Sequence, residues 1–253
     1  MIKRKIFLYE LKRAILSKAY LFFILIISVY AVYSLKTSVL CGYADTAPFS
    51  EWSFLNYLFL MAPFLGTILI FYISRLYSPN ERKVMKITST MQFSGPIYFF
   101  LKLIVVSLTY LIAVILTVVA CFIFYWKVFD FTNYGKLSIC IILVLVPPLL
   151  LLQGVGIWLS KVKQNLSFLL ILLLFLSSTK EDIPSYFLDV LGNTILQIPR
   201  DQVPIGGTIA FTLPNEFVVS RIVFSLIGIV LIIAGCLRYQ STREMKPVVA
   251  SKG

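Results

Sequence analysis

The chain has 253 residues, of which 59% are hydrophobic and only 13% are charged, and its mean hydropathy is +0.92. A soluble domain of this size would carry nearly twice that charged fraction, so the composition indicates an all-α, polytopic membrane protein. The sequence contains no histidine, which excludes histidine-based metal sites, histidine general bases and Ser-His-Asp triads.

The net charge of +12 and the four cysteines do not indicate a soluble function. Most basic residues lie beside apolar runs, where Lys and Arg set membrane topology, so we expect no nucleic-acid partner. No two cysteines have C-x-x-C spacing, which favours small buried side chains over a metal or redox site. We therefore expect no metal site, and a single transmembrane domain over residues 1–253, because neither a repeat nor a low-complexity linker is visible.

The N-terminal arm, residues 1–18, is predicted to form an elbow helix at the membrane surface. Phe7 and Leu11 belong to an imperfect apolar stripe, and Glu10 lies between them in the sequence. The apolar run that follows, at about 19–35, is longer than the roughly 7–15 residues of a signal-peptide core. We therefore expect an uncleaved first span.

Six apolar runs predict six transmembrane helices. They lie at about 19–35, 54–74, 101–126, 137–159, 166–177 and 217–237. The fifth run is short, because its apolar part from Leu166 to Leu176 makes roughly 17 Å of helix against a hydrocarbon core of about 30 Å.

The segment 178–216 is predicted to complete this fifth crossing as an external re-entrant or gate region. A helix that starts near Pro184 would carry several apolar residues on one side: Tyr186, Phe187, Val190, Leu191 and Leu196. The chain is then broken at Pro199, Pro204, Gly206 and Gly207. The alternative is a helix that lies flat on the outer surface. Arg221 should begin the sixth span and extend toward the outer interface.

The connector 75–102 is highly charged and contains a helix signal. Ser78-Pro79-Asn80-Glu81 has the pattern of a capping box, in which Ser78 caps a helix and Glu81 reaches back to the Ser78 N–H. We predict a short amphipathic helix at 79–93, ended by Gly95-Pro96. Its apolar stripe contains Val84, Ile87, Thr88 and Met91, and its basic residues Arg82, Lys83 and Lys86 face away. Such a helix can rest on the inner leaflet or dock in a groove on another protein.

Lys and Arg are distributed unevenly between the two sides of this topology. With the N-terminus inside, the inner segments hold 17 of the 23 basic residues and the outer segments hold 6. The positive-inside rule therefore predicts that both termini and the 79–93 helix are cytoplasmic. The expected location is the cell membrane, with lipids in contact with the spans.

Polar features within the predicted spans are sparse. Pro147-Pro148 should kink the fourth span, and Gln153 could face the bundle interior or hydrogen-bond a neighbouring helix. Tyr110 and Thr117 are further candidates for a translocation path. Such an apolar path favours a lipid, a lipid-linked molecule or an amphiphilic peptide or drug-like cargo over sugars and ions.

The order of these features resembles one family of membrane proteins. It comprises an elbow with "YELKRAILSKAYLF", the connector "SPNERKVMKITSTMQFSGPIYFFLK", six spans and an external region before the last span. Together they resemble the permease subunit of an ABC-2 type (type V, ABCG-like) ABC transporter. Glu81, Pro96 and Lys102 stand where that family has an acidic residue, a proline and a lysine, whereas Met85 or Lys86 replaces its usual glycine.

This resemblance implies export of cargo with energy from a separate subunit. The 79–93 helix would be the coupling helix that docks on an ATP-binding cassette subunit, and the chain would pair with a second permease copy or paralogue. ATP and Mg would be bound by the partner, so this chain is expected to need no cofactor and to be no enzyme. The sequence has no G-x-x-x-x-G-K-[ST] phosphate loop, in agreement with this division of roles.

The residues alone leave other classes open. An accessory or structural membrane protein without transport activity would show the same spans. An intramembrane enzyme would need clustered acids, histidines or a Ser/Lys pair at depth, but the only adjacent acidic pair, Glu181-Asp182, lies in a loop. An ion channel or secondary transporter usually needs a charged group near the midplane, and none of the predicted spans carries one.

Overall fold

The computed structural model describes residues 2–88, 95–179, 185–202 and 209–244, and these residues form helices and connections without a strand. The elements are α1 (Ile2–Ile15), α2 (Lys18–Ser34), the π-helical η1 (Leu35–Val39), α3 (Glu51–Leu76), α4 (Pro79–Thr88), α5 (Gly95–Phe129), α6 (Gly135–Val162), the 3₁₀ helix η2 (Gln164–Phe168), α7 (Leu169–Thr179), the 3₁₀ helix η3 (Asn193–Leu196), α8 (Gln197–Arg200) and α9 (Asn215–Glu244).

Within the described residues, five helices are long and apolar enough to cross a membrane. They are Lys18–Val39, Glu51–Leu76, Ile97–Phe129, Gly135–Val162 and Asn215–Leu237, and they coincide with the first four predicted spans and the last. This is the make-up of a polytopic membrane protein. The predicted fifth span corresponds to a shorter apolar helix, Gln164–Thr179, so a sixth crossing stays a prediction.

The long helices pack around α3, which is the most buried of them. Its apolar residues lie on all sides, as expected for a helix enclosed by others, and Trp52, Met61 and Ile70 are each fully buried. The helices α5, α6 and α7 contact α3, and α9 packs on α6. At the edges, α2 and α9 leave large apolar side chains exposed, such as Phe22 and Val230, which is the surface that lipid would cover.

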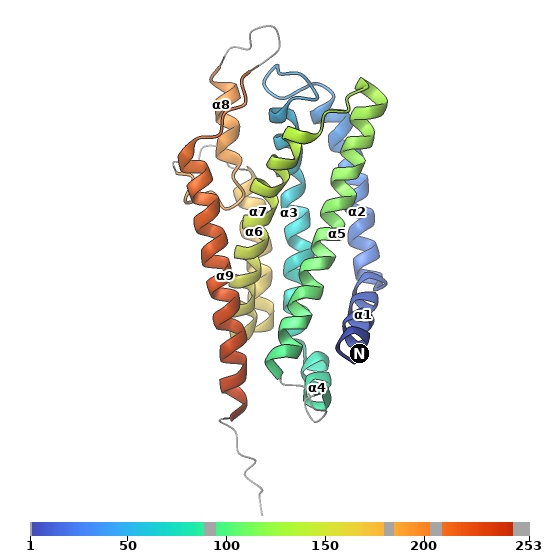
Figure 1. The fold of residues 1–253 in the computed structure, drawn as a ribbon, viewed down its shortest axis with the longest axis vertical. Coiled ribbons are helices and arrows are strands. Elements are labelled where there is room, and N and C mark those ends of the chain that lie inside the picture. Colours follow the sequence, from blue (N-terminus) through green and yellow to red (C-terminus); the bar gives the residue numbers. More distant parts are fainter. Residues whose placement is uncertain (1, 89–94, 180–184, 203–208, 245–253) are drawn as a thin grey trace, which may run out of the picture.

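The two ends of the bundle differ (Figure 1). Helices α1 and α4 and the C-terminal end of α9 lie at one end, which we call the α4 end; α8 and the α5–α6 connection lie at the other, the α8 end. At the α4 end, α1 ends at Ile15, and the Ser17 hydroxyl then caps α2 by accepting a hydrogen bond from the Tyr20 N–H at 3.2 Å.

Residues 185–202, which we call the cap segment, differ from the prediction. No helix forms over 185–192, and residue 184 lies outside the described residues. The Asp189 carboxylate accepts hydrogen bonds from the Gly192 and Thr194 N–H groups, both at 2.7 Å, and such local bonds compete with a helix. The one-sided apolar helix is therefore wrong: Leu191 is buried, whereas Phe187 is exposed.

The prediction for Arg221 is also wrong. Its side chain is 1% exposed and lies against the rings of Phe217 and Phe224, whose centroids are each 4.9 Å from the guanidinium carbon. Carbonyl groups of the cap segment accept its hydrogen bonds, including Val190 O at 2.8 Å. Arg221 does not extend to the interface, because these carbonyls and rings replace water around it.

Candidate functional site

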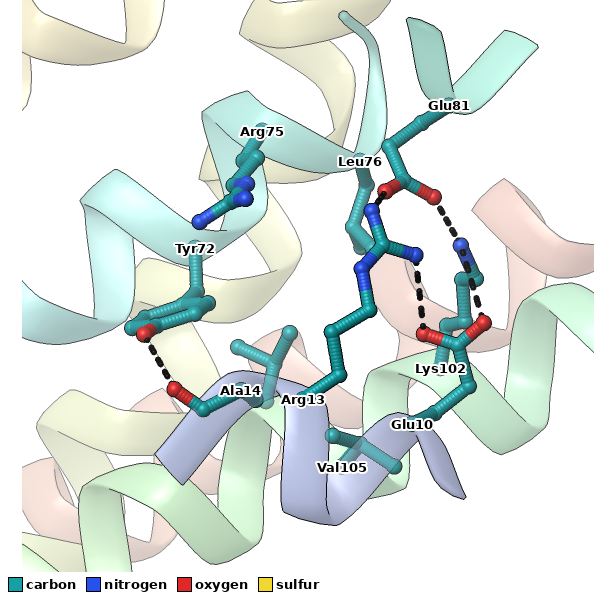
Figure 2. Close-up of a pocket in the computed structure, with 10 residues that line it drawn as sticks. Glu10, Arg13, Ala14, Tyr72, Arg75, Leu76, Glu81, Lys102 and Val105 are labelled. Atoms are coloured by element: carbon teal, nitrogen blue, oxygen red, sulfur yellow. Dashed lines mark hydrogen bonds and ion pairs between the residues drawn. The ribbon is translucent and has the colours of Figure 1, made fainter. Parts of the chain in front are cut away.

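A cluster of charged side chains at the α4 end joins three separate helices (Figure 2). Glu81 of α4 accepts hydrogen bonds from Arg13 of α1 and from Lys102 of α5. Glu10, one turn before Arg13, completes the cluster: its carboxylate lies 3.5 Å from Arg13 Nη1 and 3.8 Å from Lys102 Nζ. We call these four residues the α4 charge cluster.

The centre of the α4 charge cluster is buried. Glu81 is 5% exposed and Lys102 is 3% exposed, whereas the Arg13 side chain remains 37% exposed. A buried carboxylate or ammonium group is costly unless it is paired, so Glu81 and Lys102 depend on each other. The pairing fixes α4 against the start of α5.

The charges also shift the pKa values of Glu81 and Arg13. Desolvation by itself would raise the pKa of Glu81, but the hydrogen bonds and charges of Lys102 and Arg13 outweigh it and hold that pKa below its usual value. Desolvation would likewise lower the pKa of Arg13, but the Glu81 and Glu10 carboxylates outweigh it and raise that pKa. Both groups are therefore charged at neutral pH.

Two tyrosines extend this arrangement. The Tyr98 hydroxyl donates to Glu10 Oε1 at 2.9 Å, and the ring of Tyr98 lies 5.0 Å from Lys102 Nζ. On the other side, the Tyr72 hydroxyl of α3 donates to Ala14 O at 2.9 Å and is 2.7 Å from the Ser17 hydroxyl. The elbow helix α1 is thus bound to α3, α4 and α5, and the α4 charge cluster together with Ala14 and Tyr72 lines a pocket at this end (Figure 2).

The capping box forms only in part. The Glu81 N–H donates to the Ser78 hydroxyl at 3.3 Å, as predicted for a cap. The return bond is absent, because the Ser78 N–H donates to Arg75 O at 3.1 Å and the Glu81 carboxylate is occupied by Arg13 and Lys102. The role predicted for the Glu81 side chain in the capping box is therefore wrong.

The other residues predicted for the coupling helix are described to different extents. Lys83 is exposed and Val84 is half-buried. The side chains of Arg82, Ile87 and Thr88 and all of Met91 lie outside the described residues. In the elbow, Phe7, Glu10 and Leu11 are all half-buried, and Glu10 belongs to the α4 charge cluster. Pro96 lies in the first turn of α5, where its missing N–H costs no hydrogen bond.

The residues predicted for a translocation path are buried within the bundle: Tyr110, Thr117, Pro147, Pro148 and Gln153. The Tyr110 hydroxyl donates to Leu145 O at 3.1 Å, and the Thr117 hydroxyl donates to Val114 O in its own helix. The Gln153 amide donates to Leu103 O at 3.2 Å and accepts from the Ser107 hydroxyl at 2.9 Å. Tyr110 and Gln153 therefore join α5 to α6, whereas the Thr117 hydroxyl bonds only within α5.

Sequence reasoning missed Arg13 and Tyr98 as members of the site. A signal was present in Lys102, because a lone lysine inside "YFFLKLIVV" requires an anionic partner. Glu10 and Glu81 are the acids of the predicted inner segments that the topology places near Lys102. Arg13 follows Glu10 by three residues on the same helix face, so it could have been added.

Comparison of the chain with models of protein families, with curated proteins and with solved structures gives no match.

Proposed function

We propose that the chain is the membrane-spanning permease subunit of an ATP-driven ABC exporter, with α4 as its coupling helix. The observation that best supports this proposal is the connection of α4, through the buried Glu81, to α1 and to α5. A force applied to α4 would pass directly to the start of a long apolar helix. A helix that only rests on lipid has no need of a buried ion pair to the bundle.

The energy source would be a separate ATP-binding cassette subunit, since the sequence has no phosphate loop. Both termini would be cytoplasmic, with the α4 end facing the ATPase, because the basic residues of the elbow and of the α3, α5 and α6 ends gather there. The cap segment would then lie at the outer end and form the external gate region.

The cargo would be an apolar or amphiphilic molecule such as a lipid, a lipid-linked molecule or a drug-like peptide. Since Tyr110 and Gln153 are buried in the packing of this chain, we place the path between two permease chains, identical or paralogous. The exposed apolar faces of α2, α5 and α9 provide surface for such a pairing.

Purification of the tagged chain from its native membranes tests this proposal. We expect an ATP-binding subunit to accompany it in a stoichiometric amount, and we expect the chain alone to hydrolyse no ATP. Absence of any ATP-binding chain, or turnover by the purified single chain, would contradict the proposal.

A matched pair of variants tests the role of α4 in the same experiment. Val84→Asp places a carboxylate on the proposed docking face and should reduce retention of the ATPase roughly tenfold or more. Val162→Asp makes the same change at a residue that is 79% exposed at the same end but outside α4, and it should leave retention unchanged. Equal retention in both variants would remove α4 from the docking surface.

A further inference from the structure

Besides the packing of η3 on α3 and a hydrogen bond from the Asn193 amide to Ser177 O of α7 at 3.2 Å, the cap segment has two attachments on different parts of the chain. On one side, Arg221 of α9 donates hydrogen bonds to carbonyl groups of the segment. On the other side, the Tyr43 hydroxyl, in the connection between η1 and α3, donates to Leu196 O at 3.2 Å. The ring of Tyr43 also lies 5.3 Å from the Arg200 guanidinium carbon.

The α9 side of this attachment is buried. Arg221 is 1% exposed and Asp189 is 0% exposed. The Asp189 carboxylate shapes the turn from within, because it accepts from the Gly192 N–H, the Thr194 N–H and the Thr194 hydroxyl at 2.7–2.8 Å. Arg221 then binds the carbonyl groups that this turn presents, those of Tyr186, Asp189 and Val190.

Gly192 brings the backbone of the cap segment directly against α9. Its φ of 99° lies in the left-handed region, which a side chain disfavours. An added Cβ would lie 3.0 Å from the Phe217 ring and 3.3 Å from Arg221 Nη1. The turn and the guanidinium are therefore fitted to each other without space between them.

The Tyr43 side is more accessible to water. Tyr43 is half-buried and Arg200 is exposed, so water can replace the interactions made there as they break. Separation on the α9 side would instead leave the buried guanidinium of Arg221 without the carbonyl groups of the cap segment that accept its hydrogen bonds. The two attachments therefore differ in the free energy needed to open them.

We infer that the cap segment is anchored on α9 by Arg221 and opens on its Tyr43 side. Arg221 is a positioning residue in this arrangement. Opening exposes Ile195 and Leu196, which are 0% and 4% exposed and belong to the η3 helix that contacts α3. The inference rests on contacts within this chain alone, so it is independent of the proposed export function.

Cysteine labelling of the purified chain in detergent tests the inference. Cys41 and Cys236, which are exposed and half-buried, are replaced by Ser; the buried Cys121 and Cys140 remain as reporters of global unfolding. One probe, Leu191→Cys, lies next to the Arg221 attachment, and the other, Leu196→Cys, lies at the Tyr43 attachment. A water-soluble maleimide should label the Leu196→Cys probe about tenfold faster than the Leu191→Cys probe.

Substitutions at the two attachments should separate the probes. Tyr43→Phe removes the hydroxyl but keeps the ring, and it should accelerate labelling at 196 several-fold while the rate at 191 stays unchanged. Arg221→Met should accelerate labelling at both positions while Cys121 and Cys140 stay unlabelled, and Arg221→Lys should give an intermediate rate. If Arg221 served only general stability, Arg221→Met would accelerate labelling at 191, 196, Cys121 and Cys140 together.

Equal wild-type rates at 191 and 196, or a faster rate at 191, would overturn the inference. So would an unchanged rate at 191 in a folded Arg221→Met protein. Should Arg221→Met expose Cys121 and Cys140, Gly192→Ala replaces it, because the added Cβ presses on Phe217 and Arg221. Gly192→Ala must then accelerate labelling at 191, and an unchanged rate contradicts the anchor.

Discussion

The Glu81 carboxylate binds the side chains of Arg13 and Lys102, which are 68 and 21 residues away in the sequence. It therefore connects α4 to α1 and to α5. The contribution of such an ion pair to stability depends on how far it is buried from water. An exposed pair such as Glu51 and Lys136, 3.9 Å apart with the lysine 79% exposed, contributes little to stability because water screens it. The buried Glu81 has no such screening.

Replacing Glu81 by Gln should destabilise the folded chain by roughly 2 kcal/mol at neutral pH, because Lys102 stays buried and loses its closest anion. The folded pKa of Glu81 lies below its ordinary 4.5. The stabilisation is therefore fully present above that ordinary pKa and is lost as the pH falls through the lower, folded value. Thermal unfolding in detergent, followed against pH, measures the difference between wild type and variant.

We expect this difference to stay constant from about pH 8 to pH 6 and to close in acid below the ordinary pKa. Glu51→Gln is the control, and it should change the unfolding temperature little at any pH. A wild-type advantage that disappears above pH 6, or equal effects of the two variants, would contradict the buried role of Glu81.

At the scale of elements, α6 and α9 pack closely against each other. Two glycines permit this approach: a Cβ on Gly228 would lie 2.6 Å from Leu150 O, and a Cβ on Gly154 would lie 2.8 Å from Leu231 Cβ. The Trp158 indole N–H also donates to Leu231 O at 3.1 Å. Small residues that let backbones meet are the usual basis of helix association in lipid.

Gly228→Ala should therefore destabilise the chain by about 2 kcal/mol or more, because the added methyl group meets backbone atoms that cannot rotate away. Gly135→Ala is the matched control, since its Cβ would meet only Asn133 Oδ1 at 3.8 Å. Unfolding temperatures in detergent compare the two. Similar stability of both variants would show that α6 and α9 are not packed this closely.

The elements that the sequence predicts well are those whose whole length is apolar. The five long helices were predicted because every residue of a span meets lipid or another helix. The helix predicted from near Pro184 was wrong because the shape of the cap segment depends on Asp189 and Arg221, which interact across 32 residues and leave no periodic pattern. Part of the α4 charge cluster could be predicted, because Lys102 in an apolar run indicates a buried cation. The pairing of Arg13 with Glu81 could not, because it depends on how α1 and α4 meet in the fold.

At the scale of the whole molecule, the two ends of the bundle predict its orientation. Asp130 and Gln202 are exposed on the segments of the α8 end, and Lys83 is exposed at the α4 end. Single cysteines at 130 and 202 should react with an impermeant reagent in intact cells, and a cysteine at 83 should not. Asp189 is unsuitable as a third position because it is buried. Labelling at 83 from outside would reverse the orientation.

The central claim is that α4 contacts an ATPase, and site-specific photocrosslinking from α4 in native membranes tests it most directly. A photoreactive amino acid at position 83, which is exposed on α4, should crosslink to an ATP-binding subunit. The same amino acid at position 36, an exposed lysine at the α8 end, should not. Crosslinks from position 83 to lipid alone, or equal crosslinking from both positions, would contradict the account.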